Sequence, residues 1–120
     1  MPEERVAIFI DGSNLYHCLE QQFGCTRVDM GKLAQKLCAG RRLIRTYYYN
    51  AAHDQKSNPG AYAEQQKFFD ALSYIPYFEV RLGRLEPRGN TLVEKGVDLR
   101  MAVDMLLTAL TNAYDTAILV

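Results

Sequence analysis

Two aspartates stand where a parallel α/β sheet would expose chemically active side chains. Asp11 directly follows the apolar run Val6 to Ile10 (VAIFI), which predicts a strand buried on both faces. Asp98 lies near the start of an amphipathic stretch that predicts a helix over residues 97–113. Ligands of open parallel sheets bind beyond the carboxyl ends of the strands. If the first and last predicted strands are neighbours, the two carboxylates meet at that edge.

A pair of carboxylates at this edge suits a hard divalent cation such as Mg²⁺ or Mn²⁺. Such an ion lowers the pKa of a bound water and offsets the charge that grows on a phosphodiester under attack. Asn14 could orient Asp11 or accept a hydrogen bond from a water at the ion, and Lys95 could hold a phosphate oxygen. The residue types therefore indicate metal-assisted phosphodiester hydrolysis.

The same residues also have ordinary structural explanations. Asp11 fits a turn or cap residue, Asn14 fits a helix cap, and Asp98 fits the first-turn acid that a helix dipole favours. Asp104 follows Asp98 in the same predicted helix but points about 120° away around its axis. Asp104 is therefore either a supporting residue of the site or polar surface, and both explanations stay open.

Strands and helices alternate along the chain. Two helices are predicted to begin at Ser13 or Asn14 and at Asp29 or Met30, and two more to cover residues 61–75 and 97–113. Strands are predicted over residues 6–10, 43–49, 77–82 and 116–120. Residues 83–96 are predicted to form a long surface loop or a short ribbon. In the last helix, Leu99, Val103, Leu106 and Leu110 lie along one face at helical spacing. This order predicts an α/β fold, with a Rossmann-like parallel sheet of about four strands flanked by helices.

The last predicted strand, residues 116–120 (TAILV), is apolar enough to lie inside a sheet. No later element would cover its free edge, and an uncovered apolar edge strand is prone to aggregation. We therefore expect the natural domain to continue past Val120, so that residues 1–120 form a single domain that lacks its C-terminal part.

Composition sets further limits. A chain of 120 residues fits one domain, and no stretch reaches the roughly 20 apolar residues of a membrane span. Its N-terminus is too short and too charged for a signal peptide, so a cytoplasmic protein with no membrane partner is expected. The three cysteines include no CxxC pair, and neither His17 nor His53 has zinc-ligand spacing to them.

Charge alone does not identify a partner, because 14 basic residues balance 14 acidic ones. Arg81, Arg84, Arg88 and Lys95 nevertheless fall in one stretch. Such a run is either a solvated loop or a guide for a phosphate backbone, and the sequence leaves both open.

Two motifs together resemble a known family. The segments FIDGSNLY and KGVDLRMAVDML, followed by the strand TAILV, resemble the NYN domain of the PIN-like nuclease superfamily, with the bacterial LabA-like branch as the most similar. The resemblance covers nearly the whole chain and implies a Rossmann-like nuclease that binds Mg²⁺ or Mn²⁺ and cleaves RNA, with single-stranded RNA as the expected partner. A homodimer is also left open.

The resemblance assigns roles to individual residues. It implies that Asp11 and Asp98 are catalytic carboxylates of the metal site, that Asp104 occupies the acidic position of the family's helix, and that Asn14 and Lys95 are the polar and basic partners. Members of the family follow the fourth strand with an SGDxDF-type motif that supplies more metal-site aspartates. This sequence ends at Val120, so we expect an incomplete site.

The same residues give less support to other functions. Haloacid-dehalogenase-like phosphatases need a second acid two residues after the first, where this chain has Ser13, and no G-x-G-x-x-G motif supports a dinucleotide site. A catalytically inactive RNA-binding, protein-interaction or regulatory module remains the main alternative. Tyr47, Tyr48 and Tyr49 could stack bases, although a strand with alternate rings in the core explains them more simply.

Overall fold

The computed structural model describes residues 3–88 and 91–120, and it describes side chains for residues 3–83 and 96–120. The elements in chain order are β1 (Arg5–Asp11), α1 (Gly12–Phe23), α2 (Met30–Cys38), β2 (Arg42–Ala52), α3 (Pro59–Ser73), β3 (Phe78–Arg88), β4 (Thr91–Lys95), α4 (Val97–Leu110) and β5 (Thr116–Leu119). Among the helices of these described ranges, none is long and apolar enough to cross a membrane.

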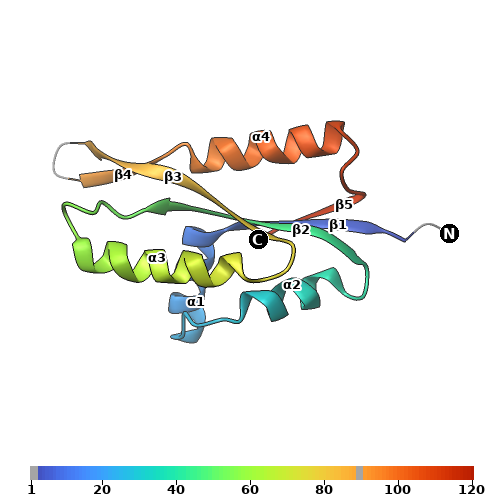
Figure 1. Cartoon of the computed structure of the whole chain (residues 1–120), viewed down its shortest axis with the longest axis horizontal. Helices are drawn as coiled ribbons and strands as arrows, with labels where there is room; N and C mark the ends of the chain where they lie inside the picture. The colour runs from blue at the N-terminus through green and yellow to red at the C-terminus, as the bar shows by residue number, and fades with distance from the viewer. Residues whose placement is uncertain (1–2, 89–90) are drawn as a thin grey trace.

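The strands form one sheet in the order β4-β3-β2-β1-β5. Neighbouring strands among β3, β2, β1 and β5 run parallel, whereas β4 pairs antiparallel with β3. This arrangement confirms the predicted α/β fold with parallel strands (Figure 1). The segment predicted as a loop or ribbon is a ribbon, because β3 runs on to Arg88 and pairs with β4.

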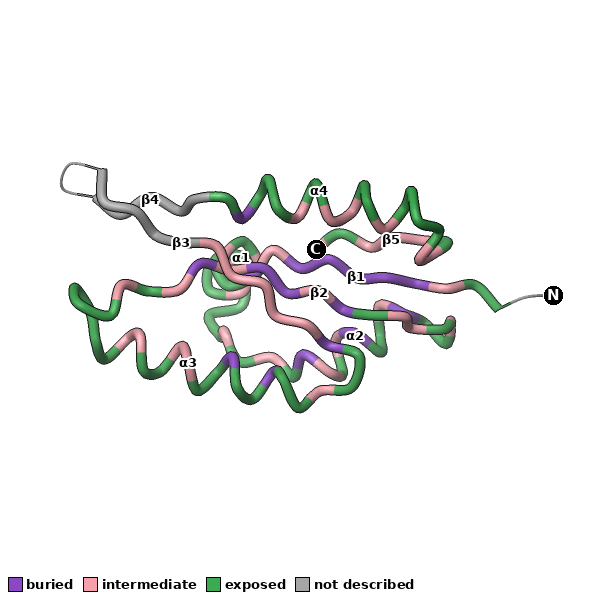
Figure 2. The backbone as a smooth tube through the Cα atoms, turned by 45° about the horizontal axis from the view of Figure 1, so that its top comes forward, coloured by how far each residue is buried: buried purple, intermediate pink, exposed green. Residues whose placement is uncertain are grey.

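The sheet is covered on both faces, and its apolar side chains divide accordingly. Val6, Ile8 and Ile10 of β1 pack with α2 and α3, while Ala7 and Phe9 pack with α4. Figure 1 shows α1, α2 and α3 on one side of the sheet and α4 on the other. Buried residues run along β1 and the adjoining part of β2 (Figure 2). The continuous apolar run of β1 is thus explained by burial on two sides.

Helix α4 does not face the sheet with the apolar residues that lie at helical spacing. It is shorter than predicted, and its apolar residues Leu99, Leu106 and Leu110 are 70%, 61% and 74% exposed, with Val103 also exposed. The side that faces the sheet carries Val97, Met101, Asp104, Met105 and Thr108 instead. The apolar face that the sequence shows is therefore not the face that packs on the sheet. Periodicity could not decide the rotation, since apolar residues lie on both sides of this helix.

The entry of β5 into the sheet is fixed by Arg5. Its backbone N–H donates to Asp115 Oδ2 at 2.8 Å, and its guanidinium donates to both carboxylate oxygens of Asp115. These hydrogen bonds lower the pKa of Asp115 to about 2. At the other end of β5, the Asp11 N–H donates to the Val120 carbonyl at 3.0 Å. Strand β5 therefore ends directly beside Asp11.

Thr46 is a buried hydroxyl that supports a stability prediction. It is 0% exposed in β2, and its Oγ1 has no hydrogen-bond partner among the described residues. Thr46→Val is expected to raise the free energy of unfolding by about 1 kcal/mol, because it removes an unpaired buried polar group. Urea unfolding measures the change. Thr108→Val is the control, since the Thr108 hydroxyl donates to the Asp104 carbonyl and its loss should not stabilise. A destabilised Thr46→Val variant would mean that the hydroxyl has a partner.

Candidate functional site

Asp11 joins the end of β1 to the start of α1. Its Oδ1 accepts a hydrogen bond from the Asn14 backbone N–H at 3.1 Å, so Asp11, and not Ser13 or Asn14, is the N-cap of α1. Asp11 also extends the alternation of β1, which places it on the same face as Phe9, the face covered by α4. The cap uses one carboxylate oxygen. No hydrogen bond of Oδ2 appears among the described residues.

Asp98 approaches the same edge of the sheet from α4. It lies in the first turn of that helix and is exposed. Its neighbour Val97 is buried against Phe9, Tyr49 and Ala51. Tyr49 is also the register partner of Asp11 across β1 and β2. The first turn of α4 therefore packs on the carboxyl end of the sheet, on the face to which Asp11 belongs. That the two carboxylates meet there stays a prediction from the sequence.

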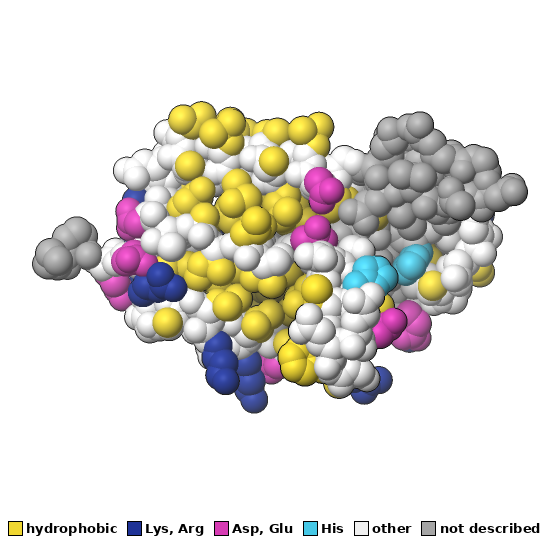
Figure 3. All heavy atoms as spheres, turned by 180° about the vertical axis from the view of Figure 1, so that it is seen from behind, with side chains coloured by type: hydrophobic (Ala, Val, Ile, Leu, Met, Phe, Trp, Pro, Cys, Tyr) yellow, Lys and Arg dark blue, Asp and Glu magenta, His cyan; other side chains and the backbone are white. Residues whose placement is uncertain are grey.

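Figure 3 shows acidic side chains between a broad apolar area and the two histidines of the chain. Asp98 has no hydrogen bond or ion pair within the part of the chain whose side chains are described. Among the described side chains, Asp98 and the second oxygen of Asp11 therefore have no partner that would compete with a ligand.

Asp104 does not join this pair. Its Oδ2 accepts a hydrogen bond from the Tyr49 hydroxyl at 2.9 Å and lies 3.5 Å from Arg81 Nε. Burial, followed by the hydrogen bond to Asp104, raises the pKa of Tyr49, so Tyr49 keeps its proton and donates it. Asp104 therefore links the sheet-facing side of α4 to Tyr49 of β2 and Arg81 of β3.

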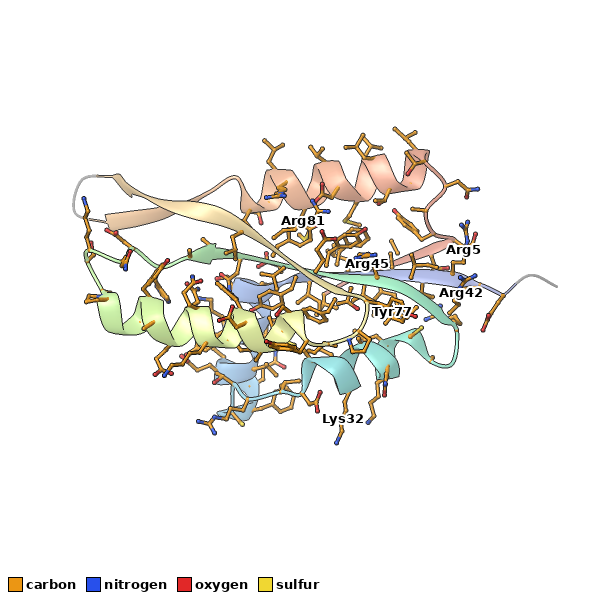
Figure 4. All side chains as sticks on the ribbon, viewed as in Figure 1. Arg5, Lys32, Arg42, Arg45, Tyr77 and Arg81 are labelled. Carbon is orange, nitrogen blue, oxygen red and sulfur yellow. The ribbon has the colours of Figure 1, made fainter. Side chains whose placement is uncertain are left out.

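Arg81 belongs to the same buried network. Its guanidinium lies 5.2 Å from the centre of the Tyr47 ring and pairs with Glu79 at 3.4 Å as well as with Asp104. Figure 4 shows Arg81 beneath α4. In the described structure, Arg81 therefore makes contacts within the protein that an RNA backbone would have to compete with.

The other predicted basic residues lie outside the described side chains. Arg84 and Arg88 belong to the backbone of β3, and Lys95 ends β4 opposite Arg84. Their backbones follow the ribbon that leads into α4, and their side chains lie outside the described residues.

Asn14 contributes differently from the prediction. Its backbone N–H holds Asp11, while its side chain is exposed. Asn50 was not singled out by the sequence, and Tyr48 was considered only as a base-stacking or core residue. Asn50 Nδ2 donates to the Tyr48 hydroxyl at 3.3 Å. Burial raises the pKa of Tyr48, the Asn50 bond lowers it, and the charge of Asp11 raises it. The influence of Asp11 indicates that the Tyr48 hydroxyl lies near the carboxylate. An asparagine at the carboxyl end of a strand was the available sequence signal.

The tyrosine triplet is divided between the two faces of the sheet. Tyr48 packs with α2 and α3, whereas Tyr49 packs with α4 and Tyr47 lies against the same cluster. Tyr48 and Tyr49 are 3% and 1% exposed, so these two rings are core residues. This burial favours the simpler of the two explanations for the triplet.

The carboxylates suit a Mg²⁺ or Mn²⁺ ion that takes only one or two of its ligands from the protein. Among the described residues, no three His, Cys, Asp or Glu side chains form a group that could hold a metal. Mg²⁺ is commonly held by one or two carboxylates, several waters and the phosphates of the substrate. The oxygens of Asp11 and Asp98 that have no partner among the described side chains match this requirement, whereas the engaged carboxylate of Asp104 does not.

Comparison with known proteins places this chain in a family. The profile of the NYN domain, a family of the PIN-like nuclease superfamily, matches residues 5–120. No curated protein matches significantly. A solved structure of a protein of unknown function from Vibrio parahaemolyticus has a TM-score of 0.74 at 20% sequence identity; the alignment covers 98% of this chain and 65% of the Vibrio chain, which supports the fold. The chain belongs to the NYN domain family.

Proposed function

We propose that this domain is a ribonuclease that hydrolyses RNA phosphodiester bonds with the help of Mg²⁺ or Mn²⁺ held by Asp11 and Asp98. The proposal rests on Asp11 at the carboxyl end of β1 and on the first turn of α4, which carries Asp98 and packs on the same face of the sheet. Membership of the NYN domain family, which belongs to a nuclease superfamily, supports it. A bound divalent ion would supply Lewis acidity, lowering the pKa of a water and offsetting phosphate charge.

The chain's own residues orient the carboxylate of Asp11 and set the backbone position of Asp98. The Asn14 amide holds Asp11 in one orientation. The Tyr49–Asp104 hydrogen bond and the burial of Val97 set the rotation and the start of α4, and with them the position of Asp98. Asp104 therefore acts as a positioning residue in this proposal. Side chains that are fixed before the substrate arrives cost less to organise during the reaction.

RNA would lie along the carboxyl edge of the sheet. Arg84, Arg88 and Lys95 belong to the ribbon beside this edge, and we keep their contact with the RNA backbone as a prediction from the sequence. Arg81 is a weaker candidate because of its contacts within the protein. A cytoplasmic location and a homodimer also stay predictions.

Metal removal tests the function. Labelled single-stranded RNA should be cleaved in Mn²⁺, should stay intact in EDTA, and should be cleaved again when Mn²⁺ is added in excess. Cleavage that continues in EDTA would contradict a metal-dependent reaction. RNA that is bound but not cleaved in Mn²⁺ would favour the alternative, an inactive RNA-binding or regulatory module.

A further inference from the structure

A cavity opens between α1 and α3 beside the end of β1. Its volume is about 890 Å³, within the roughly 300–1,000 Å³ of small-molecule sites. Tyr48 and Asn50 of β2 line its base, and Gly12 and Ser13, which directly follow Asp11 in the chain, also line it. A molecule in this cavity would therefore reach the carboxylate edge.

Aromatic rings line two sides of the cavity. Tyr16 of α1 is 49% exposed and Phe68 of α3 is 40% exposed. The Phe68 ring is held by an edge contact with Tyr48, at a centroid distance of 5.9 Å. His17 and His53 also line the cavity, and Figure 3 shows both histidines on the same face of the molecule. Partly exposed, fixed rings of this kind are suited to stacking on a planar ligand.

The polar side chains at the base are largely engaged with the protein. Gln65 accepts a hydrogen bond from the His53 N–H and donates to the Ala51 carbonyl. Asn50 accepts from the Ala51 N–H at 2.8 Å and donates to Tyr48. Asn50 and Gln65 therefore have little capacity left to read the edge of a ligand, and a ligand at the base of the cavity would be held mainly by the rings.

We propose that this cavity binds a base of single-stranded RNA, next to the phosphodiester that lies at Asp11 and Asp98. The position of the phosphodiester rests on the proposed function. The base is held by stacking on Phe68 and Tyr16, with little preference among the bases, because every base has a flat face. A base in a duplex cannot enter, so the cavity selects unpaired RNA.

The test measures binding without cleavage. A short fluorescent single-stranded RNA is titrated with the full chain in EDTA, and anisotropy reports the dissociation constant. Phe68→Leu and Tyr16→Leu keep apolar volume but remove the flat ring, and each should weaken binding about tenfold. Tyr74→Leu is the matched control, since Tyr74 is an exposed aromatic residue at the end of α3 outside the cavity. Circular dichroism verifies that each variant is folded.

The outcomes separate this proposal from the nuclease activity. Selective weakening by Phe68→Leu and Tyr16→Leu supports the cavity even if Mn²⁺ never produces cleavage. Folded variants that bind like Tyr74→Leu overturn it, even if the chain cleaves RNA. Failure of the wild-type chain to bind in EDTA, or equal binding of a duplex of the same sequence, also overturns it.

Discussion

Asp11→Asn is expected to lower the rate of Mn²⁺-dependent RNA cleavage by about 10³-fold and to leave the stability of the protein nearly unchanged. Asparagine has the same shape as aspartate and is an equally good N-cap, so its side-chain oxygen can still accept the Asn14 N–H. The substitution removes the negative charge that a hard cation requires. Single-turnover cleavage and thermal unfolding of the same preparation measure the two effects.

This substitution separates the two explanations of Asp11. If Asp11 were only a helix cap, Asn would preserve both stability and cleavage, and retained cleavage would sink its assignment as a metal ligand. Asp11→Ala removes the cap as well, and should cost about 1 kcal/mol of stability in addition. Asp29→Asn is the stability control, because Asp29 caps α2 through the Lys32 N–H in the same way. Asp70→Asn, on the exposed side of α3, is the activity control.

The sequence was sufficient to predict the local features that depend on a single element. The two-sided burial of β1, the helix that follows Asp11 and the start of α2 at Asp29 and Met30 follow from residue type and spacing. These features therefore agree with the structure.

Features that depend on two elements were not predictable in the same way. The exposed leucines of α4 fit the helical period as well as its partly buried methionines do, and only contact with the sheet decides between them. The role of Asp104 depends on Tyr49, which lies 55 residues away in the sequence. The cavity likewise depends on how α1 and α3 are placed over Tyr48. Periodicity gives no information on such long-range pairs.

Gly12→Ala should destabilise the protein by about 2–3 kcal/mol, since overpacking a rigid core typically costs 1–3 kcal/mol. A Cβ at residue 12 would overlap the Tyr48 ring, meeting Cζ, the hydroxyl and, at 2.8 Å, Cε1. The ring has little room to withdraw, because it is 3% exposed and surrounded by Phe68, Phe69 and Phe78. Helix propensity alone would favour alanine by about 1 kcal/mol, so the sign of the change shows which effect is larger. Denaturant unfolding measures it.

Gly60→Ala provides the matched control, because Gly60 is also in the first turn of a helix but a Cβ there meets nothing within 4 Å. It should be neutral or slightly stabilising. A double-mutant cycle with Tyr48→Leu tests the cause, since removing the ring should relieve at least about 1 kcal/mol of the Gly12→Ala cost. If Gly12→Ala behaved like Gly60→Ala, the Tyr48 ring would have to move freely. It could then neither fix the start of α1, where Asp11 is held, nor form a rigid base for the cavity.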